Sequence, residues 1–196
     1  MIAMQATAPT LPTCVTLRNG KHALIREIRP QDKSGVVAAF HRLSEDSRYT
    51  RFMASMNELP DALLESAVHP IPARECALVA VAGTEDGGDL IGGARYNVDP
   101  ETGCCEFAVT VIDGWHGLGL ARVLMQTLIP LARADGYRSM IGYVLASNTA
   151  MRGLAHRLGF KDKMCPDDAT LRVVDLDLAE SIEHETSHHD PHAGCH

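Results

Sequence analysis

The chain has 196 residues, of which 45% are hydrophobic and 22% are charged. This length and composition predict one soluble globular domain with short extensions at its ends. The formal net charge of −7 argues against a nucleic-acid partner, because nonspecific binding to phosphates needs a basic surface. No stretch approaches the roughly 20 apolar residues of a membrane span. Residues 1–12 do not have the pattern of a secretory signal, so no membrane association is expected.

The cysteines and histidines give weaker indications of the cellular compartment and of metal binding. Six cysteines are scattered along the chain without a C-x-x-C pair, which favours a reducing, cytoplasmic compartment over a zinc ribbon or a disulfide framework. Residues 181–196 are polar and hold five of the ten histidines. Such a tract can bind Zn²⁺ or Ni²⁺ weakly. A polar, disordered tail is the preferred interpretation, and no metal site is predicted, although a metal-handling protein stays a rival function.

The predicted elements alternate between strands and helices along the chain. In the first half we expect a disordered lead-in over residues 1–14, a strand over 22–28, a helix over 34–43, a helix after Pro60, and strands over 76–81 and 90–98. In the second half we expect a strand over 104–112, a Gly-rich turn over 113–119, a long helix ending before Gly136, a strand over 139–145, a helix over 148–158, and strands over 160–164 and 171–178.

The strand, Gly-rich turn and helix between residues 107 and 122 form the most informative unit. Glycines let a backbone approach a ligand closely, and the first turn of a helix offers free N–H groups to an anion such as phosphate. A plain connecting turn is the alternative. The Walker pattern is absent because the turn has no lysine. The Rossmann pattern fails because the third glycine is missing and the turn lies past mid-chain.

A third pattern fits better. The run Trp115-His-Gly-Leu-Gly-Leu-Ala121 resembles the Q/R-x-x-G-x-G/A signature of the GNAT acyltransferase superfamily. It departs from that signature at His116, where Gln or Arg is usual, and at Leu118, where a basic residue is common. A second landmark follows where Asn148 opens a helix that closes with Leu-Gly-Phe at Phe160. Residues 43–52 are similar to the acetyltransferase domain of bacterial protein-lysine acetyltransferases.

The resemblance implies a fold and a co-substrate. The fold is one α/β (α+β) domain over residues 15–180, with a mixed, mostly antiparallel central sheet flanked by helices. The sheet should splay after the strand that ends near Val111, so that acetyl-CoA lies in the opening. The implied acetyl-CoA-binding residues are Val109, Val111, His116, Gly117, Leu118, Gly119, Leu120, Ala121, Arg122, Asn148 and Met151. Homodimer formation is left open.

The chemistry needs a base, because an amine with a pKa near ~10.4 is almost fully protonated at neutral pH. Glu106 is the candidate. Strand alternation places it on one face with Ala108 and Thr110, which are small enough to leave space for a substrate. The resemblance supports this choice, since some members have a glutamate there. The alternative is that Glu106 is only a solvated carboxylate on the strand, without a catalytic role.

The resemblance also implies an oxyanion donor and a general acid. The donor is the backbone N–H of Val111, while Ala155 stands where many members have a tyrosine that protonates the thiolate. His156 is adjacent, but neighbouring helix positions point about 100° apart. Cys104 and Cys105 would be nucleophiles in a ping-pong route, which is disfavoured because no partner marks them.

The expected activity is direct acetyl transfer from acetyl-CoA to a primary amine, either a protein lysine or a small molecule. A non-catalytic CoA-sensing or protein-interaction module of the same fold is the alternative.

Overall fold

The protein is described by a computed structural model that covers residues 9–84 and 86–179. The predicted tail over residues 181–196 lies outside the described residues, as does most of the predicted lead-in. The strands are β1 (Thr13–Thr16), β2 (His22–Glu27), β3 (Glu75–Ala82), β4 (Leu90–Val98), β5 (Cys105–Val111), β6 (Ser139–Leu145), β7 (Lys161–Met164) and β8 (Leu171–Asp177). The helices are α1 (Lys33–His41), α2 (Glu45–Phe52), α3 (Asp61–Val68), α4 (Leu120–Ala134) and α5 (Thr149–Arg157), with a 3₁₀ turn at Pro30–Asp32.

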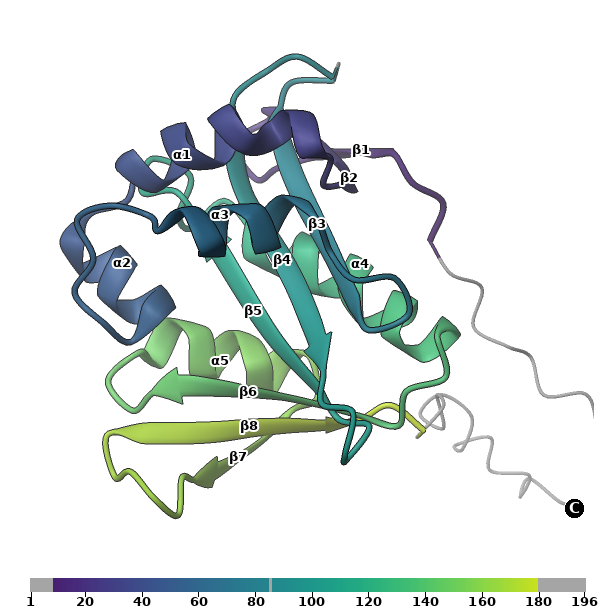
Figure 1. The fold of residues 1–196 in the computed structure, drawn as a ribbon, viewed down its shortest axis with the longest axis vertical. Coiled ribbons are helices and arrows are strands. Elements are labelled where there is room, and N and C mark those ends of the chain that lie inside the picture. Colours follow the sequence, from purple (N-terminus) through teal and green to yellow (C-terminus); the bar gives the residue numbers. More distant parts are fainter. Residues whose placement is uncertain (1–8, 85, 180–196) are drawn as a thin grey trace, which may run out of the picture.

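The strands form one sheet in the order β1-β2-β3-β4-β5-β6-β8-β7. Neighbouring strands are antiparallel except for β5 and β6, which are parallel. Figure 1 shows α1 and α3 in front of the sheet and α4 behind it. The predicted mixed, mostly antiparallel sheet with helices on both faces is therefore confirmed. Between residues 9 and 179, apart from Glu85, no helix combines the length and apolarity that a membrane crossing requires.

The sheet opens between β5 and β6. Their register pairs only Cys105 with Met140 and Glu106 with Ile141, whereas β5 stays paired with β4 as far as Val111. Beyond Glu106 the two strands diverge, as Figure 1 shows. The outer half of β5 is therefore an edge inside the sheet, with backbone groups that an extended ligand can pair with.

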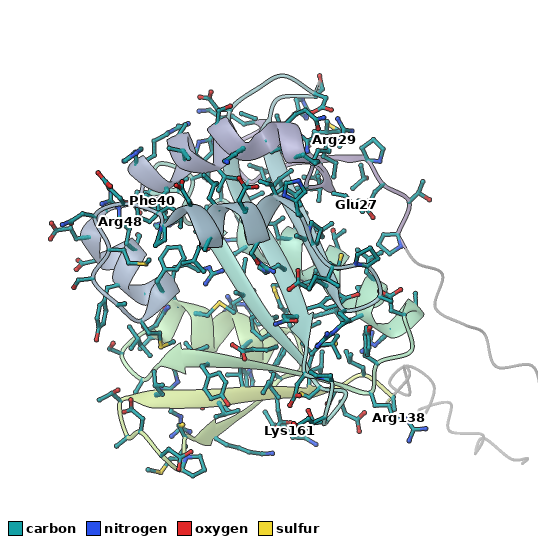
Figure 2. The ribbon with its side chains drawn as sticks, in the orientation of Figure 1. Glu27, Arg29, Phe40, Arg48, Arg138 and Lys161 are labelled. Atoms are coloured by element: carbon teal, nitrogen blue, oxygen red, sulfur yellow. The ribbon has the colours of Figure 1, made fainter. Side chains whose placement is uncertain are left out.

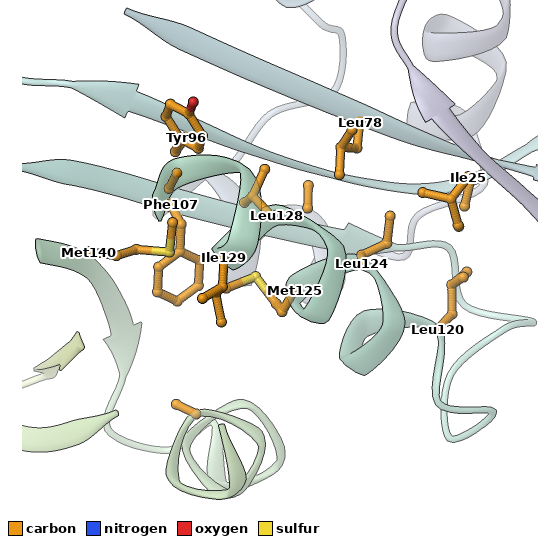
Figure 3. Close-up of a cluster of buried hydrophobic side chains, with 14 of the residues drawn as sticks. Ile25, Leu78, Tyr96, Phe107, Leu120, Leu124, Met125, Leu128, Ile129 and Met140 are labelled. Atoms are coloured by element: carbon orange, nitrogen blue, oxygen red, sulfur yellow. The ribbon is translucent and has the colours of Figure 1, made fainter. Parts of the chain in front are cut away.

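The core lies between the sheet and α4. Leu120, Leu124 and Leu128 recur at a spacing of four residues and are each at most 1% exposed, so they form one helical stripe. They pack in the cluster that includes Ile25 and Tyr96 on the strands (Figure 3). Burial of each such side chain stabilises the fold by about 1.5–3 kcal/mol. This packing fixes the N-terminal end of α4 against β5.

Two elements were not predicted from the sequence. The lead-in expected over residues 1–14 was wrong at its end, because Thr13 and Cys14 pair with Ile25 and Leu24 as part of β1. The strand has only four residues, too few for a clear alternation. Helix α2 has the polar sequence EDSRYTRF and buries no residue fully, so it lacks apolar periodicity. Its detectable signals are the Ser44 cap and the acidic first turn.

The contact between α1 and α2 includes a cation–π interaction. The guanidinium carbon of Arg48 on α2 lies 4.7 Å from the centre of the Phe40 ring on α1. Figure 2 labels both residues on the same side of the molecule. A cation over an aromatic face is attractive, and Phe40 is 3% exposed. Tertiary contacts therefore hold α2 where its own sequence is only weakly helical.

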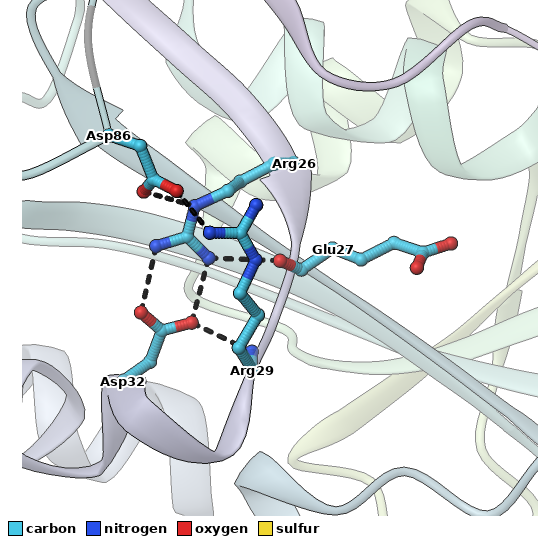
Figure 4. A network of polar contacts seen from close by, with 5 residues as sticks. All are labelled: Arg26, Glu27, Arg29, Asp32 and Asp86. Carbon is cyan, nitrogen blue, oxygen red and sulfur yellow. Dashed lines mark hydrogen bonds and ion pairs between the residues drawn. The ribbon is translucent and has the colours of Figure 1, made fainter.

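An ion-pair network ties α1 to the sheet (Figure 4). Buried Arg26 on β2 donates two hydrogen bonds to the Asp32 carboxylate, at 2.7 and 2.8 Å, and one to Asp86 at 2.7 Å. The hydrogen bonds from Arg26 are the largest cause that lowers the pKa of Asp32 below its ordinary value. Arg29 adds a second cation to Asp86. The network fixes the entry of the chain into α1.

We expect Arg26→Met to lower the free energy of unfolding by about 3–5 kcal/mol, because it leaves Asp32 charged and nearly buried without its partner. Urea unfolding measures this loss. The folded-state pKa of Asp32 is lowered, so its contribution is complete above the ordinary pKa of about 3.9 and is lost as the pH falls through the lowered value. The difference between wild type and variant should therefore shrink in acid. Arg29→Met is the matched control, because Arg29 is 52% exposed, and a comparable loss there would contradict the argument.

Candidate active site

A cleft of about 1090 Å³ passes through the sheet where β5 and β6 diverge. Its walls come from β5, the Gly-rich turn, α2, the C-terminal half of β6 and one face of α5. Residues from both faces of β5 line it, so it is open toward α4 on one side and toward α2 on the other. Two ligands can therefore meet at β5 from opposite sides.

The backbone of β5 is oriented by its pairing with β4. The N–H of Ile112 donates to the carbonyl of Ile91 at 3.1 Å. Because backbone groups alternate between the two sides of a strand, the groups of Val111 and Val109 point away from β4 and into the opening. A hydrogen bond from His116 supports this orientation, because its Nε2 donates to the Val111 carbonyl oxygen at 2.7 Å. The backbones of Val109 and Val111 therefore face the cleft.

The Gly-rich turn has the geometry of an anion site. Gly117 and Gly119 have φ values of 74° and 89°, which side chains disfavour. Gly119 is the N-cap of α4, and Leu120, Ala121 and Arg122 follow it along the cleft wall. The N–H groups of this first turn and the helix dipole favour a phosphate there. Leu118 differs from the other predicted residues, because it packs against the core and is not part of the lining.

Arg18 is a site residue that was not predicted from the sequence. Its backbone N–H donates to the Leu118 carbonyl at 3.2 Å, and its Nη1 donates to the Gly117 carbonyl at 3.4 Å. Its side chain lines the cleft. Arg18 therefore brings a guanidinium to the turn from a segment 99 residues away. It brings a positive charge to the turn, where Leu118 has none.

We expect Arg18→Ala to weaken acetyl-CoA binding by about 10-fold or more, since a hydrogen bond to a charged group contributes about 1.5–3 kcal/mol. Isothermal titration calorimetry at two salt concentrations measures this. The loss should be smaller at high salt, where screening weakens the contact in wild type. Asn19→Ala is the control, because Asn19 follows Arg18 in the turn between β1 and β2 and lies outside the cleft lining. Equal affinities of wild type and Arg18→Ala would contradict the assignment.

The opposite wall comes from the start of α5. Asn148 Oδ1 accepts a hydrogen bond from the Met151 N–H at 3.0 Å, so the predicted N-cap role of Asn148 is confirmed. Both side chains line the cleft. Ala155 is 1% exposed, while His156 is exposed and outside the lining. Neither residue replaces the tyrosine that the resemblance implied.

Glu106 lies at the apex of the opening. It is the last residue of β5 that pairs with β6. Its side chain is exposed to the cleft, on the face it shares with Ala108 and Thr110. That face is turned toward α2, opposite to the side on which α4 begins. Its carboxylate can therefore meet an acceptor amine that arrives from the α2 side.

The adjacent cysteines are poor nucleophiles. Cys105 is completely buried, and this burial raises the pKa of its thiol to about 12. A thiolate, the reactive form, is then rare at neutral pH. Cys104 is half-buried and outside the cleft lining. Neither thiol is therefore placed to form an acyl-cysteine in the cleft.

Asp113 connects α2 to the Gly-rich turn. Its carboxylate accepts hydrogen bonds from the Ser44 N–H at 2.7 Å and the Ser47 hydroxyl at 2.5 Å. Burial raises the pKa of Asp113, but these hydrogen bonds and nearby His116 together bring it below its ordinary value. The carboxylate also lies at the N-terminus of α2, where negative charge is stabilising. Helix α2 is thus fixed to the Gly-rich turn.

Comparisons with known proteins agree with this geometry. The pattern of the Acetyltransferase (GNAT) family matches residues 37–160. The chain is 39% identical over 165 residues to an acetyltransferase of Pseudomonas aeruginosa, covering 83% of this chain and 88% of that one. It is 31% identical over 144 residues to the L-methionine sulfoximine/L-methionine sulfone acetyltransferase of the same species, covering 71% of this chain and 80% of that one.

Solved structures show the same fold. The GNAT domain of S. lividans PAT superimposes with a TM-score of 0.76 at 25% identity, over 84% of this chain and 96% of that domain. The yncA protein of Salmonella typhimurium, solved with acetyl-CoA, gives 0.60 at 21% identity, over 84% and 99%. The chain belongs to the GNAT family of acetyltransferases, enzymes that use acetyl-CoA as co-substrate and an amine as acceptor.

Proposed function

We propose that this protein transfers the acetyl group of acetyl-CoA to a primary amine by direct attack of the amine. The observation that carries the proposal is the open inner edge of β5, which ends in the anion-binding turn at Gly117 and Gly119. An extended pantetheine arm fits an unpaired strand edge, and its pyrophosphate fits a helix N-terminus. The residues present therefore suit acetyl-CoA.

In this proposal, residues on one side of β5 bind acetyl-CoA and residues on the other side act on the acceptor. Bound acetyl-CoA supplies the thioester carbonyl. The amides of Val109 and Val111 orient the arm, and the N–H of Val111 donates to the carbonyl oxygen as negative charge develops there. The amides of residues 119–122 and the guanidinium of Arg18 hold the phosphates. Asn148 and Met151 close the opposite side of the arm.

Glu106 acts on the acceptor side. Its carboxylate accepts a proton from the acceptor ammonium, directly or through one water, and so creates the neutral amine that attacks. No residue is assigned to protonate the departing thiolate. A thiol pKa near ~8.5 makes the thiolate a tolerable leaving group without such help.

The acceptor is either a small amine or a protein lysine. The relative named for methionine sulfoximine and methionine sulfone supports a small acceptor, because those compounds are amino-acid derivatives. The resemblance of residues 43–52 to bacterial protein-lysine acetyltransferases supports a protein lysine. A non-catalytic CoA-sensing module is the rival function, since Ala155 and His116 replace residues that the family signature would supply.

Turnover decides between these functions. Purified protein is incubated with acetyl-CoA and a panel of small amines, amino acids and lysine peptides, and CoA thiol release is followed together with product mass. Acetylated product with at least one acceptor supports the proposal. Tight acetyl-CoA binding without any acetylated product would support the sensing module instead.

A further inference from the structure

A second cavity lies on the acceptor side of the sheet. It has a volume of about 260 Å³ and is bounded by α1, α3 and strands β3 to β5. Most of its lining is apolar, including Val36, Phe40 and Leu59. The residues that line both this cavity and the cleft are Leu43, Arg51, Phe52, Leu63, Ala108 and Thr110. The cavity therefore adjoins the cleft on the face that carries Glu106, and we refer to it as the side pocket.

Arg51 stands at the junction of the cleft and the side pocket. It lies in the last turn of α2 and is half-buried. Within residues 9–84 and 86–179, no carboxylate lies within ion-pair distance of it, and no hydrogen bond from its guanidinium is found. Arg95, the other arginine of the side pocket, is paired with nearly buried Glu75 at 3.2 Å. The positive charge of Arg51 is thus left without a direct counter-ion.

The Phe52 ring, whose centre lies 4.9 Å from the guanidinium carbon of Arg51, is attractive to this cation but carries no negative charge. Burial is the main cause that lowers the pKa of Arg51, the charge of Arg95 lowers it further, and Glu106 opposes both. A guanidinium nevertheless stays protonated. A half-buried cation of this kind is stabilised by an anion that reaches it with two parallel hydrogen bonds, and a carboxylate has the matching shape.

We propose that Arg51 binds the carboxylate of the acceptor, so that the acceptor is an amino acid with an apolar side chain. Its amine faces Glu106, its carboxylate meets Arg51, and its side chain enters the side pocket. This inference rests on the proposed acetyl transfer and names the substrate class. A lysine side chain on a protein offers an ammonium on an apolar stem without an adjacent anion, which would leave Arg51 unpaired.

Matched acceptor pairs test the inference. Leucine is compared with 3-methylbutylamine, and phenylalanine with 2-phenylethylamine, so each pair differs only in the carboxylate. A peptide with a single lysine is the third kind of acceptor. We expect kcat/KM for each amino acid to exceed that of its matched amine by at least about 10-fold. Equal rates within the pairs, or a preference for the lysine peptide, would overturn the inference and leave acetyl transfer standing.

The variant Arg51→Met tests whether Arg51 is the residue that recognises the carboxylate of the acceptor. It should lower kcat/KM for the amino acids by about 10- to 100-fold and leave the matched amines unchanged. Arg51→Lys keeps the charge without the bidentate geometry and should give an intermediate loss. Arg42→Met is the control, because Arg42 is exposed, pairs with Asp89 and lies outside both cavities.

The remaining outcomes are distinct. If Arg51→Met lowers the rates of amino acid and amine equally while acetyl-CoA binding persists, Arg51 is structural and the inference fails. If no amine of any kind is acetylated by wild type, the proposed function fails and the inference fails with it.

Discussion

Replacing Glu106 with glutamine should lower the rate of acetyl transfer by about 10²–10⁴-fold, the usual contribution of a general base. Acetyl-CoA affinity should stay unchanged, because the side chain lies on the face of β5 turned away from α4 and the isostere preserves its shape. The loss should shrink as the pH rises toward the acceptor's pKa of about 10, where more amine is already neutral. Steady-state kinetics from pH 7 to pH 10 measure both effects.

Glu101→Gln is the matched control for this experiment. Glu101 is exposed in the β4–β5 turn and outside the cleft lining, so its variant should keep the wild-type pH profile. A near-wild-type rate for Glu106→Gln at neutral pH would show that another group removes the proton. A loss accounted for entirely by weaker acetyl-CoA binding would make Glu106 structural.

Gly119→Val should weaken acetyl-CoA binding by at least about 100-fold, which corresponds to about 3 kcal/mol or the loss of one to two hydrogen bonds to charged groups. Gly119 has a φ of 89°, a conformation that a β-branched residue strongly disfavours. The turn must therefore rearrange, and the amides proposed to hold the phosphates rearrange with it. Isothermal titration calorimetry measures the affinity.

Gly114→Ala controls for a general effect of mutating this turn. Gly114 has no heavy atom within 4 Å of the position a Cβ would take and is not among the positive-φ glycines. Its variant should bind acetyl-CoA like wild type. Unchanged affinity in Gly119→Val, with a melting temperature showing that it folds, would remove the turn from the binding site.

The parts of the site that are local in sequence could be predicted. The turn at Gly119 and the cap at Asn148 each depend on a few adjacent residues, and both have the expected geometry. The catalytic role of Glu106 stays a prediction, although alternation placed its side chain on the correct face. The splay between β5 and β6 was implied by resemblance alone, since a single strand pattern does not say where pairing with a neighbour stops.

The parts that were missed depend on contacts between distant segments. Arg18 reaches the turn across 99 residues, and nothing in its own neighbourhood marks it. Arg51 belongs to a helix without an apolar stripe, whose place is fixed by Asp113 and by the packing of Arg48 on Phe40. Such residues become visible only when the strands and helices have been assembled.

The open edge of β5 also has a consequence for the stability of the protein in the cell. An exposed strand edge is a template for pairing with other chains, and here it lies in the middle of the sheet. In the proposed binding mode, acetyl-CoA covers this edge. A ligand at 100 times its dissociation constant stabilises a fold by about 2.7 kcal/mol. We therefore expect resistance to proteolysis and aggregation to rise with the acetyl-CoA level, so that the amount of intact enzyme in the cell follows the supply of its own acetyl donor.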